Sequence, residues 1–466
     1  MSRVQKHFIY FIALLVCFAL PASGGAADPL EAPPVLDLEA AGRIALAANP
    51  SLAAAAARVE AAAQRVRQAR SAYWPRLDAS AGLSRVETAD GDYRAGLAQA
   101  RALDPTATLD DPEDYYQSAL TASWTVFDGF VRRFDLLRAR YGRAETAAVR
   151  DDVRRLLLSA VAEAYYGVQL ARESVAIAEA DADYNGRLME EARIRREIGT
   201  GSLSDVLNFE VAVNAARAAV ITARQQREEA LAGLAALLGY DGARLPAGTT
   251  LADLGAETES DLAIPEATDP LAYALAHRPD LRQGENALQG AEAGVGAARA
   301  GFWPAVSLSA RVEGDRPHDA RFREDDFGDS VALSVSYNLF SGGYHRARLA
   351  EARRNRTAAE EDLANRRLNV SAEVVRALAE LESSADQLRL QRRNADLVQR
   401  HRDLVEKEYA AGQASLVRLN EAQRNLVQTQ GRLVQARVAL HRARFALDTA
   451  TARVLERFDV AVKGSG

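Results

Sequence analysis

The sequence contains two copies of one pattern, and this internal repeat restricts the possible folds more than any other feature. Four short motifs recur in the same order in both halves, as these pairs show: Pro50 and Pro279, Trp74 and Trp303, Phe127 and Phe340, Gly199 and Gly412. The first two pairs are 229 residues apart and the last two are 213 apart, so the first half holds 16 additional residues, within the polar segment 87–113. A chain with so long a repeat folds as two copies of one supersecondary unit.

Each half is expected to run helix, strand, loop, strand, long helix, turn and shorter helix. We place the first repeat at 28–239, the second at 271–455, a linker rich in Gly, Pro, Thr and Asp at 240–270, and a tail at 456–466. The predicted elements are helices at 36–72 and 270–300, β-hairpins at 76–127 and 305–340, long helices at 130–198 and 343–411, and shorter helices at 205–239 and 415–452. The predicted fold class is therefore mixed and mainly α.

The two long helical segments contain no proline, and each would extend for about 100 Å. Apolar residues recur every seven positions in the last helix, in the row Leu419, Leu426, Leu433, Leu440 and Leu447. Small residues fill the alternate positions, an arrangement typical of long antiparallel coiled-coil helices that approach closely. A plain coiled-coil rod would explain these helices but not the strands.

Four segments alternate strictly between apolar and polar side chains. They are 77–84, 116–126, 306–313 and 331–339. Each is about ten residues long, the length that a tilted strand needs to cross a bilayer. Half-buried soluble sheets also alternate. The aromatic pairs Tyr73-Trp74 and Phe302-Trp303 precede the first strand of each hairpin, where an interfacial aromatic girdle would lie, and favour membrane strands.

Four strands cannot close a barrel, and an open sheet edge in lipid would leave backbone groups unpaired. We therefore expect each protomer to contribute four membrane β-strands to a trimeric 12-stranded β-barrel. The helices would project on one side of the sheet and form a long tube through the same threefold assembly. Pro75 and Pro304 mark the points where a helix stops and a membrane strand begins, because proline lacks the N–H that continues a helix.

The N-terminus predicts export. Residues 1–27 combine Arg3 and Lys6 with an apolar core at 8–20 and small residues before Ala27, which is the pattern of a signal peptide. The alternative is a single anchoring helix, for which the core is short. Cys17 is the only cysteine and lies within this segment, and its lipidation is left open. No later segment has 18 consecutive apolar residues, and a net charge of −6 argues against nucleic-acid binding.

These features together closely resemble the TolC-like outer membrane efflux protein family. The resemblance covers nearly all of the expected mature chain and rests on the repeat and on these motifs in order: Asn49-Pro50-Ser51-Leu52 and Arg278-Pro279-Asp280-Leu281, Trp74-Pro75 and Trp303-Pro304, Phe127-Asp128-Gly129 and Phe340-Ser341-Gly342, and the turns at 199–207 and 412–419. The resemblance implies a homotrimeric channel-tunnel in the cell outer membrane, with twelve strands continuous with a periplasmic α-barrel of long antiparallel coiled-coil helices. It would serve tripartite efflux or type I secretion, with a periplasmic adaptor and an inner-membrane pump of the RND or ABC type.

The resemblance also implies which residues matter at the periplasmic tip. Asp205 and Glu421 match acidic positions that narrow the pore, and Tyr409 matches a tyrosine of the closed-state network. Arg418 departs from the family pattern, because it occupies the second repeat's counterpart of the Asp205 position. Asp205 could instead cap the helix that follows it.

Glycine and serine residues shape the two turns at this tip. Gly199 and Gly412 are expected to end the long helices, and the turns with Ser202 and Ser415 would contact the adaptor. Asp128 and Ser341 are expected to cap the starts of the long helices.

Two other classes of protein fit the sequence less well. A periplasmic coiled-coil adaptor would also be exported, but it should have one helical hairpin flanked by soluble β-domains. An exported enzyme is disfavoured because the histidines after position 27 are scattered, His345 and His401 lie on expected helix surfaces, and no metal, phosphate or nucleophile motif appears. No cofactor is expected. The sequence is compatible with drugs, metal ions or a secreted polypeptide as the transported substrate, with either pump class, and with an open or a closed tip at rest.

Overall fold

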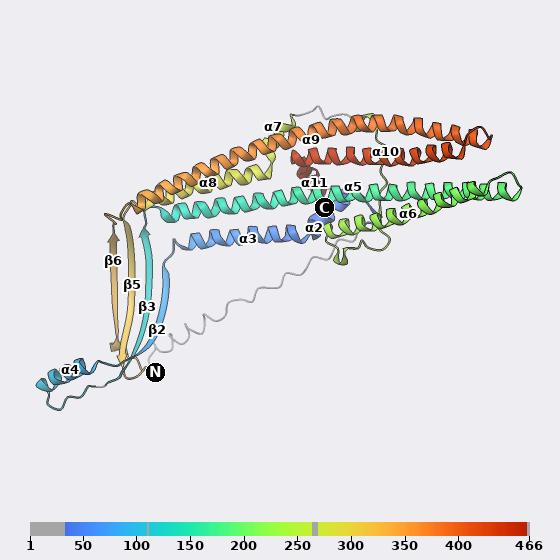
Figure 1. Ribbon diagram of the computed structural model, residues 1–466. Helices are drawn as coiled ribbons and strands as arrows, with labels where there is room; N and C mark the ends of the chain where they lie inside the picture. The colour runs from blue at the N-terminus through green and yellow to red at the C-terminus, as the bar shows by residue number, and fades with distance from the viewer. Residues whose placement is uncertain (1–32, 110, 263–268, 464–466) are drawn as a thin grey trace.

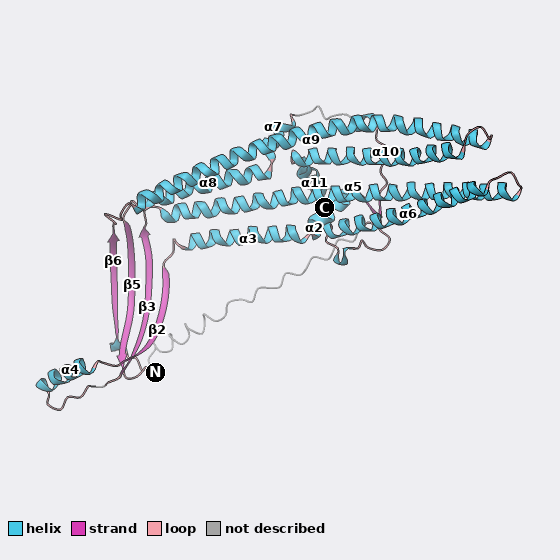
Figure 2. Ribbon diagram, viewed as in Figure 1, coloured by secondary structure: helices cyan, strands magenta, loops and turns pink. Residues whose placement is uncertain are grey.

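The computed structural model describes residues 33–109, 111–262 and 269–463 (Figure 1). Long helices lie side by side, and a four-stranded sheet runs across one end of them (Figure 2). The α-helices are α2 Leu38–Ala48, α3 Pro50–Ser71, α4 Asp90–Leu103, α5 Val131–Glu197, α6 Leu203–Leu237, α7 Pro270–His277, α8 Pro279–Ala300, α9 Tyr344–Ala410, α10 Leu416–Ala450 and α11 Arg453–Lys463. The strands are β1 Val35–Leu36, β2 Arg76–Val86, β3 Glu113–Phe127, β4 Thr250–Leu251, β5 Ala305–Pro317 and β6 Phe327–Ser336.

The sheet has the strand order β2-β3-β5-β6, with every neighbouring pair antiparallel. Its register places the apolar positions of all four strands on one face, as the row Leu77, Ala122, Ala310 and Val331 shows. Near its end β3 has a bulge, so that Phe127 rather than Val126 lies opposite Val306. Strands β2 and β6 are the two unpaired edges of this sheet.

The helices form a wall beside the sheet and two hairpins away from it. Near the sheet, α5 packs between α3 and α8, and α8 packs against α9. Farther away, α5 pairs with α6 and α9 pairs with α10. Both α5 and α9 have 67 residues and therefore extend for about 100 Å.

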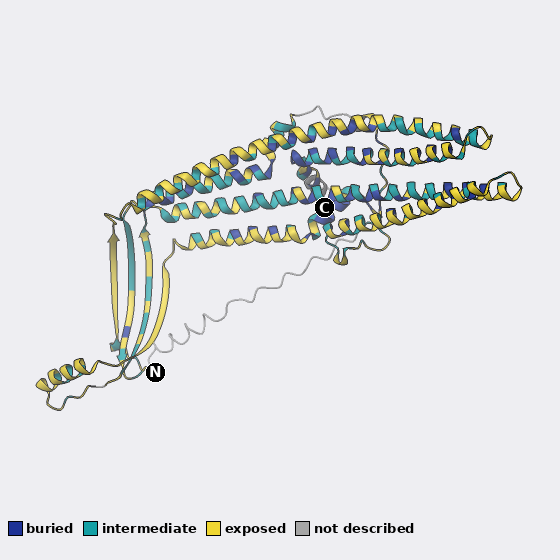
Figure 3. Cartoon of the chain, in the orientation of Figure 1, coloured by how far each residue is buried: buried dark blue, intermediate teal, exposed yellow. Residues whose placement is uncertain are grey.

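The hydrophobic core is a series of separate clusters along the helices rather than a single centre (Figure 3). In α10, Leu419, Leu426, Leu440 and Leu447 of the heptad row are buried, and Leu433 packs against the cluster beside it. The partner row on α9 includes Val374, Leu381 and Leu388, which are also buried. Heptad spacing thus becomes the coiled-coil seam between these helices.

Several elements differ from the sequence expectations. The helix expected at 36–72 is divided at Asn49-Pro50, where Asn49 ends α2 and caps α3. The helix expected at 270–300 is likewise divided before Pro279, because the residue preceding a proline avoids the helical conformation. The insertion expected to be a loop contains α4, and most of the expected tail belongs to α11.

Helix α11 forms because one of its faces is apolar. Its Val454 and Phe458 are buried against Leu158 of α5 and Phe445 of α10. The residues of the expected signal peptide lie outside the described residues.

A buried carboxylate of the linker contacts the second repeat, where Arg437 also donates to the Leu254 and Gly255 carbonyls at 3.2 and 3.0 Å. Glu257 receives hydrogen bonds from Arg392 at 2.6 Å and Arg437 at 3.0 Å, and its oxygen lies 3.2 Å from the His441 ring. Burial alone would raise its pKa, but the His441 contact and the Arg437 guanidinium lower the pKa of Glu257 to about 2. Upstream, β4 of the linker pairs in parallel with β1 of the first repeat.

Candidate functional site

One whole face of the sheet is apolar and uncovered. On the edge strand β6, Val331, Leu333 and Val335 are each at least 67 % exposed. On β2, Leu77 and Leu83 on the same face are 59 % and 66 % exposed. A continuous apolar surface of this kind marks a contact with lipid or protein. The opposite face carries mainly polar or small residues, so the sheet separates two different environments.

The four aromatic residues predicted at the membrane interface lie where helices α3 and α8 turn into strands. Trp74 and Trp303 are 73 % and 59 % exposed, and Tyr73 and Phe302 are 40 % and 42 % exposed. Arg132 of α5 lies over the Tyr73 ring. His345, expected on a solvated helix surface, instead packs its ring 5.7 Å from the Phe302 ring.

The bulge in β3 shows how the two faces continue into the helical wall. Phe127 shares the apolar face with its partner Val306, and its ring packs edge-on against the ring of Phe130 at 5.4 Å. Phe130 directly precedes α5. The start of α5 is therefore placed so that Phe130 lies on the apolar side of the sheet.

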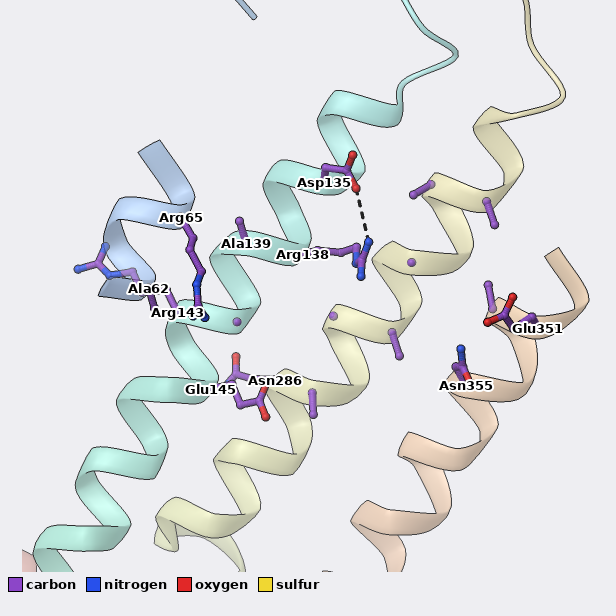
Figure 4. A pocket seen from close by; sticks show the side chains of 18 of the residues that line it. Ala62, Arg65, Asp135, Arg138, Ala139, Arg143, Glu145, Asn286, Glu351 and Asn355 are labelled. Carbon is purple, nitrogen blue, oxygen red and sulfur yellow. Dashed lines mark ion pairs between the residues drawn. The ribbon is translucent and has the colours of Figure 1, made fainter. Parts of the chain in front are cut away.

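The other side of the wall carries a polar hollow of about 620 Å³ between α3, α5, α8 and α9 (Figure 4). Its floor on α8 includes Gly290 and Gly294. Its charged lining consists of Arg65, Asp135, Arg138, Arg143, Glu145, Arg348 and Glu351. Asp135 and Arg138 form an ion pair at 3.6 Å. Because its lining carries both positive and negative side chains, this hollow is better suited to line a water-filled passage than to bind one specific ligand.

The two helical turns at the end away from the sheet have the same backbone conformation. Gly199 and Gly412 have φ values of +79° and +73°, which glycine adopts readily. In the first turn, the Thr200 N–H donates to the Arg195 carbonyl at 2.9 Å. In the second, the Gln413 N–H donates to the Glu408 carbonyl at 2.8 Å. Both turns therefore satisfy the last carbonyls of a long helix in the same manner.

Serine residues cap the helices that return from these turns. The Ser202 hydroxyl accepts from the Ser204 N–H at 3.0 Å, and the Ser415 hydroxyl accepts from the Arg418 N–H at 3.3 Å. Asp205 lies in the first turn of α6 and is not its cap, because Ser202 already occupies that position.

The long helices also start differently from the prediction. Phe130 and Gly343, rather than Asp128 and Ser341, are the capping residues, and both have a left-handed backbone. The Asp128 carboxylate still accepts a hydrogen bond from the Arg132 N–H at 3.2 Å. Asp128 therefore satisfies one of the free N–H groups at the start of α5.

The structure brings together two of the predicted tip residues, Asp205 and Tyr409. Arg195 of α5 lies over the Tyr409 ring at 5.3 Å, so the two hairpins meet here. Burial raises the pKa of the Tyr409 hydroxyl, Arg195 opposes this rise, and the charges of Asp205 and Glu191 add to it.

Arg418 and Glu421 are placed apart from that pair. Arg418 forms an ion pair with Glu408 at 3.1 Å, within its own hairpin. Glu421 is exposed on α10, and no ion pair to it occurs within the described part of the chain. In one copy of the chain, the acidic positions therefore do not form a common site.

A second contact between the hairpins was not predicted. Arg402 of α9 lies over the Tyr184 ring of α5 at 5.1 Å, and Gln423 of α10 donates to Asp181 at 2.8 Å. Burial and the charge of Glu406 raise the pKa of Tyr184 to about 12, so its hydroxyl stays neutral. These partners lie in different repeats, and no local spacing in the sequence pairs them. Within the described residues, no group of three or more His, Cys, Asp or Glu could hold a metal ion.

The sequence matches a profile described as outer membrane efflux protein over residues 42–240 and 271–453. Protein CyaE of Bordetella pertussis is 29 % identical over 398 residues, covering 80 % of each chain. The pyoverdine export outer membrane protein OpmQ of Pseudomonas aeruginosa is 27 % identical, covering 82 % of this chain and 78 % of OpmQ. The fold is similar to a crystal structure of CusC, with a TM-score of 0.75, 21 % identity and coverage of 93 % of this chain and 96 % of that one.

Proposed function

The chain belongs to the outer membrane efflux protein family, and on that basis we propose that three copies form one duct through which an inner-membrane pump exports its substrate. The family is one of outer-membrane channels. The duct would be passive, because the driving energy comes from the pump. The apolar face of the sheet would meet lipid, the polar face would line the pore, and the helices would extend into the periplasm.

The observation that carries this proposal is that the sheet has two unpaired edges of different sequence. Every residue of β2 and of β6 is exposed. An open edge cannot remain in lipid, because its N–H and C=O groups would lack partners. The β2 edge of one copy can pair with the β6 edge of the next, and head-to-tail contacts of this kind close into rings. Three copies give twelve strands.

Exposed apolar rows on helices α6 and α9 also indicate contact between copies. On α6, Leu207, Val211 and Ile221 are 52–71 % exposed, at spacings typical of a coiled-coil seam. On α9, Leu390, Leu397 and Leu404 recur every seven residues and are 55–62 % exposed. Each row would be buried against a helix of the neighbouring copy.

The composition of helix α6 gives a second reason to place its exposed apolar row in a contact between copies. Within the described residues it is the one helix that is long and apolar enough to span a membrane by length and composition alone. Because it packs against α5 over much of its length, we assign its exposed apolar row to helix packing and not to lipid.

At the tip, threefold symmetry would bring three copies of each charge close together. We assign Asp205 and Glu421 to a constriction that attracts cations, with Tyr409 and Arg418 holding the hairpins in place around it. The turns at Gly199, Ser202, Gly412 and Ser415 would contact the adaptor. The names of the relatives mention pyoverdine and cations as exported substrates, so the family resemblance does not fix the cargo.

Assembly can be tested with a charge on the α6 row. Val211 is 69 % exposed in one copy, so Val211→Asp should be harmless to a monomer. In a trimer it would bury an unpaired charge, which costs several kcal/mol. Asn208→Asp adds the same charge outside the row and serves as the control. We expect Val211→Asp alone to remove the trimer in unheated gels and in light scattering. A trimer that persists would contradict the proposed contact between copies.

The constriction can be tested by single-channel recording in planar bilayers. We expect Asp205→Ala with Glu421→Ala to reduce cation selectivity while leaving the trimer intact. Unchanged conductance and selectivity would remove both residues from the constriction.

A further inference from the structure

A second hollow, of about 710 Å³, lies beside the strand ends. It is formed by the start of α5, the last turns of α8 and a part of α9. Its lining includes Phe130, Phe134, Trp303, Arg299, Arg353 and Arg356. Aromatic rings and arginines therefore share one concave surface at the junction of helices and sheet.

This hollow opens on the apolar side of the wall. Phe130 lines it, and Phe130 packs against Phe127 on the apolar face of the sheet. Helix geometry agrees, because Gly296 and Arg299 of this hollow lie on the face of α8 opposite to Gly290 and Gly294 of the polar hollow. The two hollows thus occupy opposite sides of the same helix.

The arginines lie at a depth that matches lipid headgroups. Arg299 lies in the last turn of α8, four residues before Trp303. Arg356 of α9 is level with Glu292 of α8, since the two are joined by a hydrogen bond of 3.2 Å. Arg353 is one turn nearer to the strands. Interfacial tryptophan sits at the headgroup level of a bilayer, so Arg299 lies within the polar zone. The backbone of Arg353 lies about 12 Å from Trp303, so its long side chain has to extend towards that zone.

Two of the three arginines have uncompensated charges. Arg356 is paired with Glu292 and Glu360. Neither guanidinium of Arg299 or Arg353 has an ion pair or a hydrogen bond within the described residues. The site therefore offers two free cations above an aromatic floor, and a matching ligand needs a negative headgroup and an apolar body.

We propose that this hollow binds an anionic phospholipid of the periplasmic leaflet. Its phosphate would be held by Arg299 and Arg353, and its acyl chains would cover Phe130 and Trp303 before following the apolar face of the sheet. A free phosphate ion would satisfy the arginines but leave the aromatic floor exposed to water. The inference depends on the proposed function only in that this face of the sheet meets lipid.

The test is native mass spectrometry of the purified trimer, with phosphatidylglycerol compared with phosphatidylcholine of identical chains. The wild type should retain phosphatidylglycerol preferentially. An arginine near an anionic lipid contributes a factor of about five, so Arg299→Gln with Arg353→Gln should weaken this retention about 30-fold. Arg138→Gln with Arg348→Gln, on the polar side of the same wall, is the matched control and should change nothing.

Three outcomes would overturn the proposal: equal retention of the two lipids by the wild type, unchanged retention by the double variant, or complete displacement of the lipid by inorganic phosphate. Unheated gels of each variant report the trimer separately. If the double variant loses its lipid preference while its trimer stays intact, the result concerns this site alone. If the wild type forms no trimer, the proposed function is contradicted instead.

Discussion

Glu257 should hold the inter-repeat linker in place, and replacing it with glutamine tests this directly. Its side chain is 2 % exposed, whereas those of Arg392 and Arg437 are 33 % and 21 % exposed. Glu257→Gln keeps the shape but removes the charge that these arginines and His441 share. In the variant, water can still reach Arg392 and Arg437, so the main loss of free energy is the loss of their attraction to the carboxylate.

The pKa of Glu257 gives the net stabilisation of its charged form, which is the attraction less the cost of burying the carboxylate. The difference between its ordinary pKa of 4.5 and a value of about 2 corresponds to about 3 kcal/mol. Because the pKa is lower in the folded state, this stabilisation is fully present above pH 4.5. It declines as the pH falls through 4.5 towards 2. The variant has no carboxylate to titrate, so its linker should lack this dependence.

Hydrogen exchange of the linker measures the effect. The Ala252 N–H donates to the Leu36 carbonyl at 2.9 Å, and Gln169 and Arg172 of α5 also hold this part of the linker. The amides of residues 254–257, next to the carboxylate, are therefore the ones whose exchange reports release of the Glu257 contact. At pH 7 we expect Glu257→Gln to increase this exchange roughly 100-fold. Glu259→Gln is the control, since Glu259 is 82 % exposed and lies 3.9 Å from its nearest cation, Arg389. Equal exchange in wild type and Glu257→Gln at pH 7, or a difference that persists unchanged at pH 2 after correction for intrinsic rates, would refute the reasoning.

Four further substitutions test the helices, each by chemical unfolding of the purified protein. Gly412→Ala should lower the free energy of unfolding by about 1 kcal/mol, because Gly412 has a left-handed backbone. Gly431→Ala inside α10 should raise it by up to about 1 kcal/mol, because a methyl group there meets nothing within 4 Å. Changes of the same sign in the two variants would contradict this. Phe209→Ala should cost about 3–5 kcal/mol because its side chain is 1 % exposed in the tip cluster, and a loss below 1 kcal/mol would show that the cluster collapses around it. Gly296→Ala should destabilise as well, because its methyl group would overlap the Phe134 ring, and full recovery in Gly296→Ala with Phe134→Ala would identify that overlap as the cause.

The fold class could be predicted because its signals are periodic and occur twice. Strict alternation in four segments and heptad rows such as Leu419 to Leu447 each specify one kind of element. The family profile and the similar solved structures confirm the predicted fold class. The predicted roles at the tip and at the membrane interface stay predictions, and the single-channel recordings described above test the constriction.

Other features depend on contacts that a single sequence does not encode. The insertion was interpreted as a loop because it is polar, yet 90–103 forms α4 with a small contact of its own, from the Tyr93 hydroxyl to the Leu109 carbonyl at 3.1 Å. Ser202 and Asp205 are both good capping residues, and only the backbone path decides between them. The contact of Arg402 with Tyr184 joins residues more than 200 positions apart. No periodic pattern in the sequence predicts a contact between such distant residues.

The two unlike edges of the sheet, which are here called its β2 and β6 margins, have a genetic consequence. If the ring closes only when the β2 margin of every subunit meets the β6 margin of its neighbour, one subunit with a blocked margin inactivates the whole ring. In a cell that makes normal and blocked subunits in equal amounts, only about one eighth of randomly mixed trimers would be intact. A mutation at either margin should therefore be dominant, whereas an allele that produces no protein should be recessive.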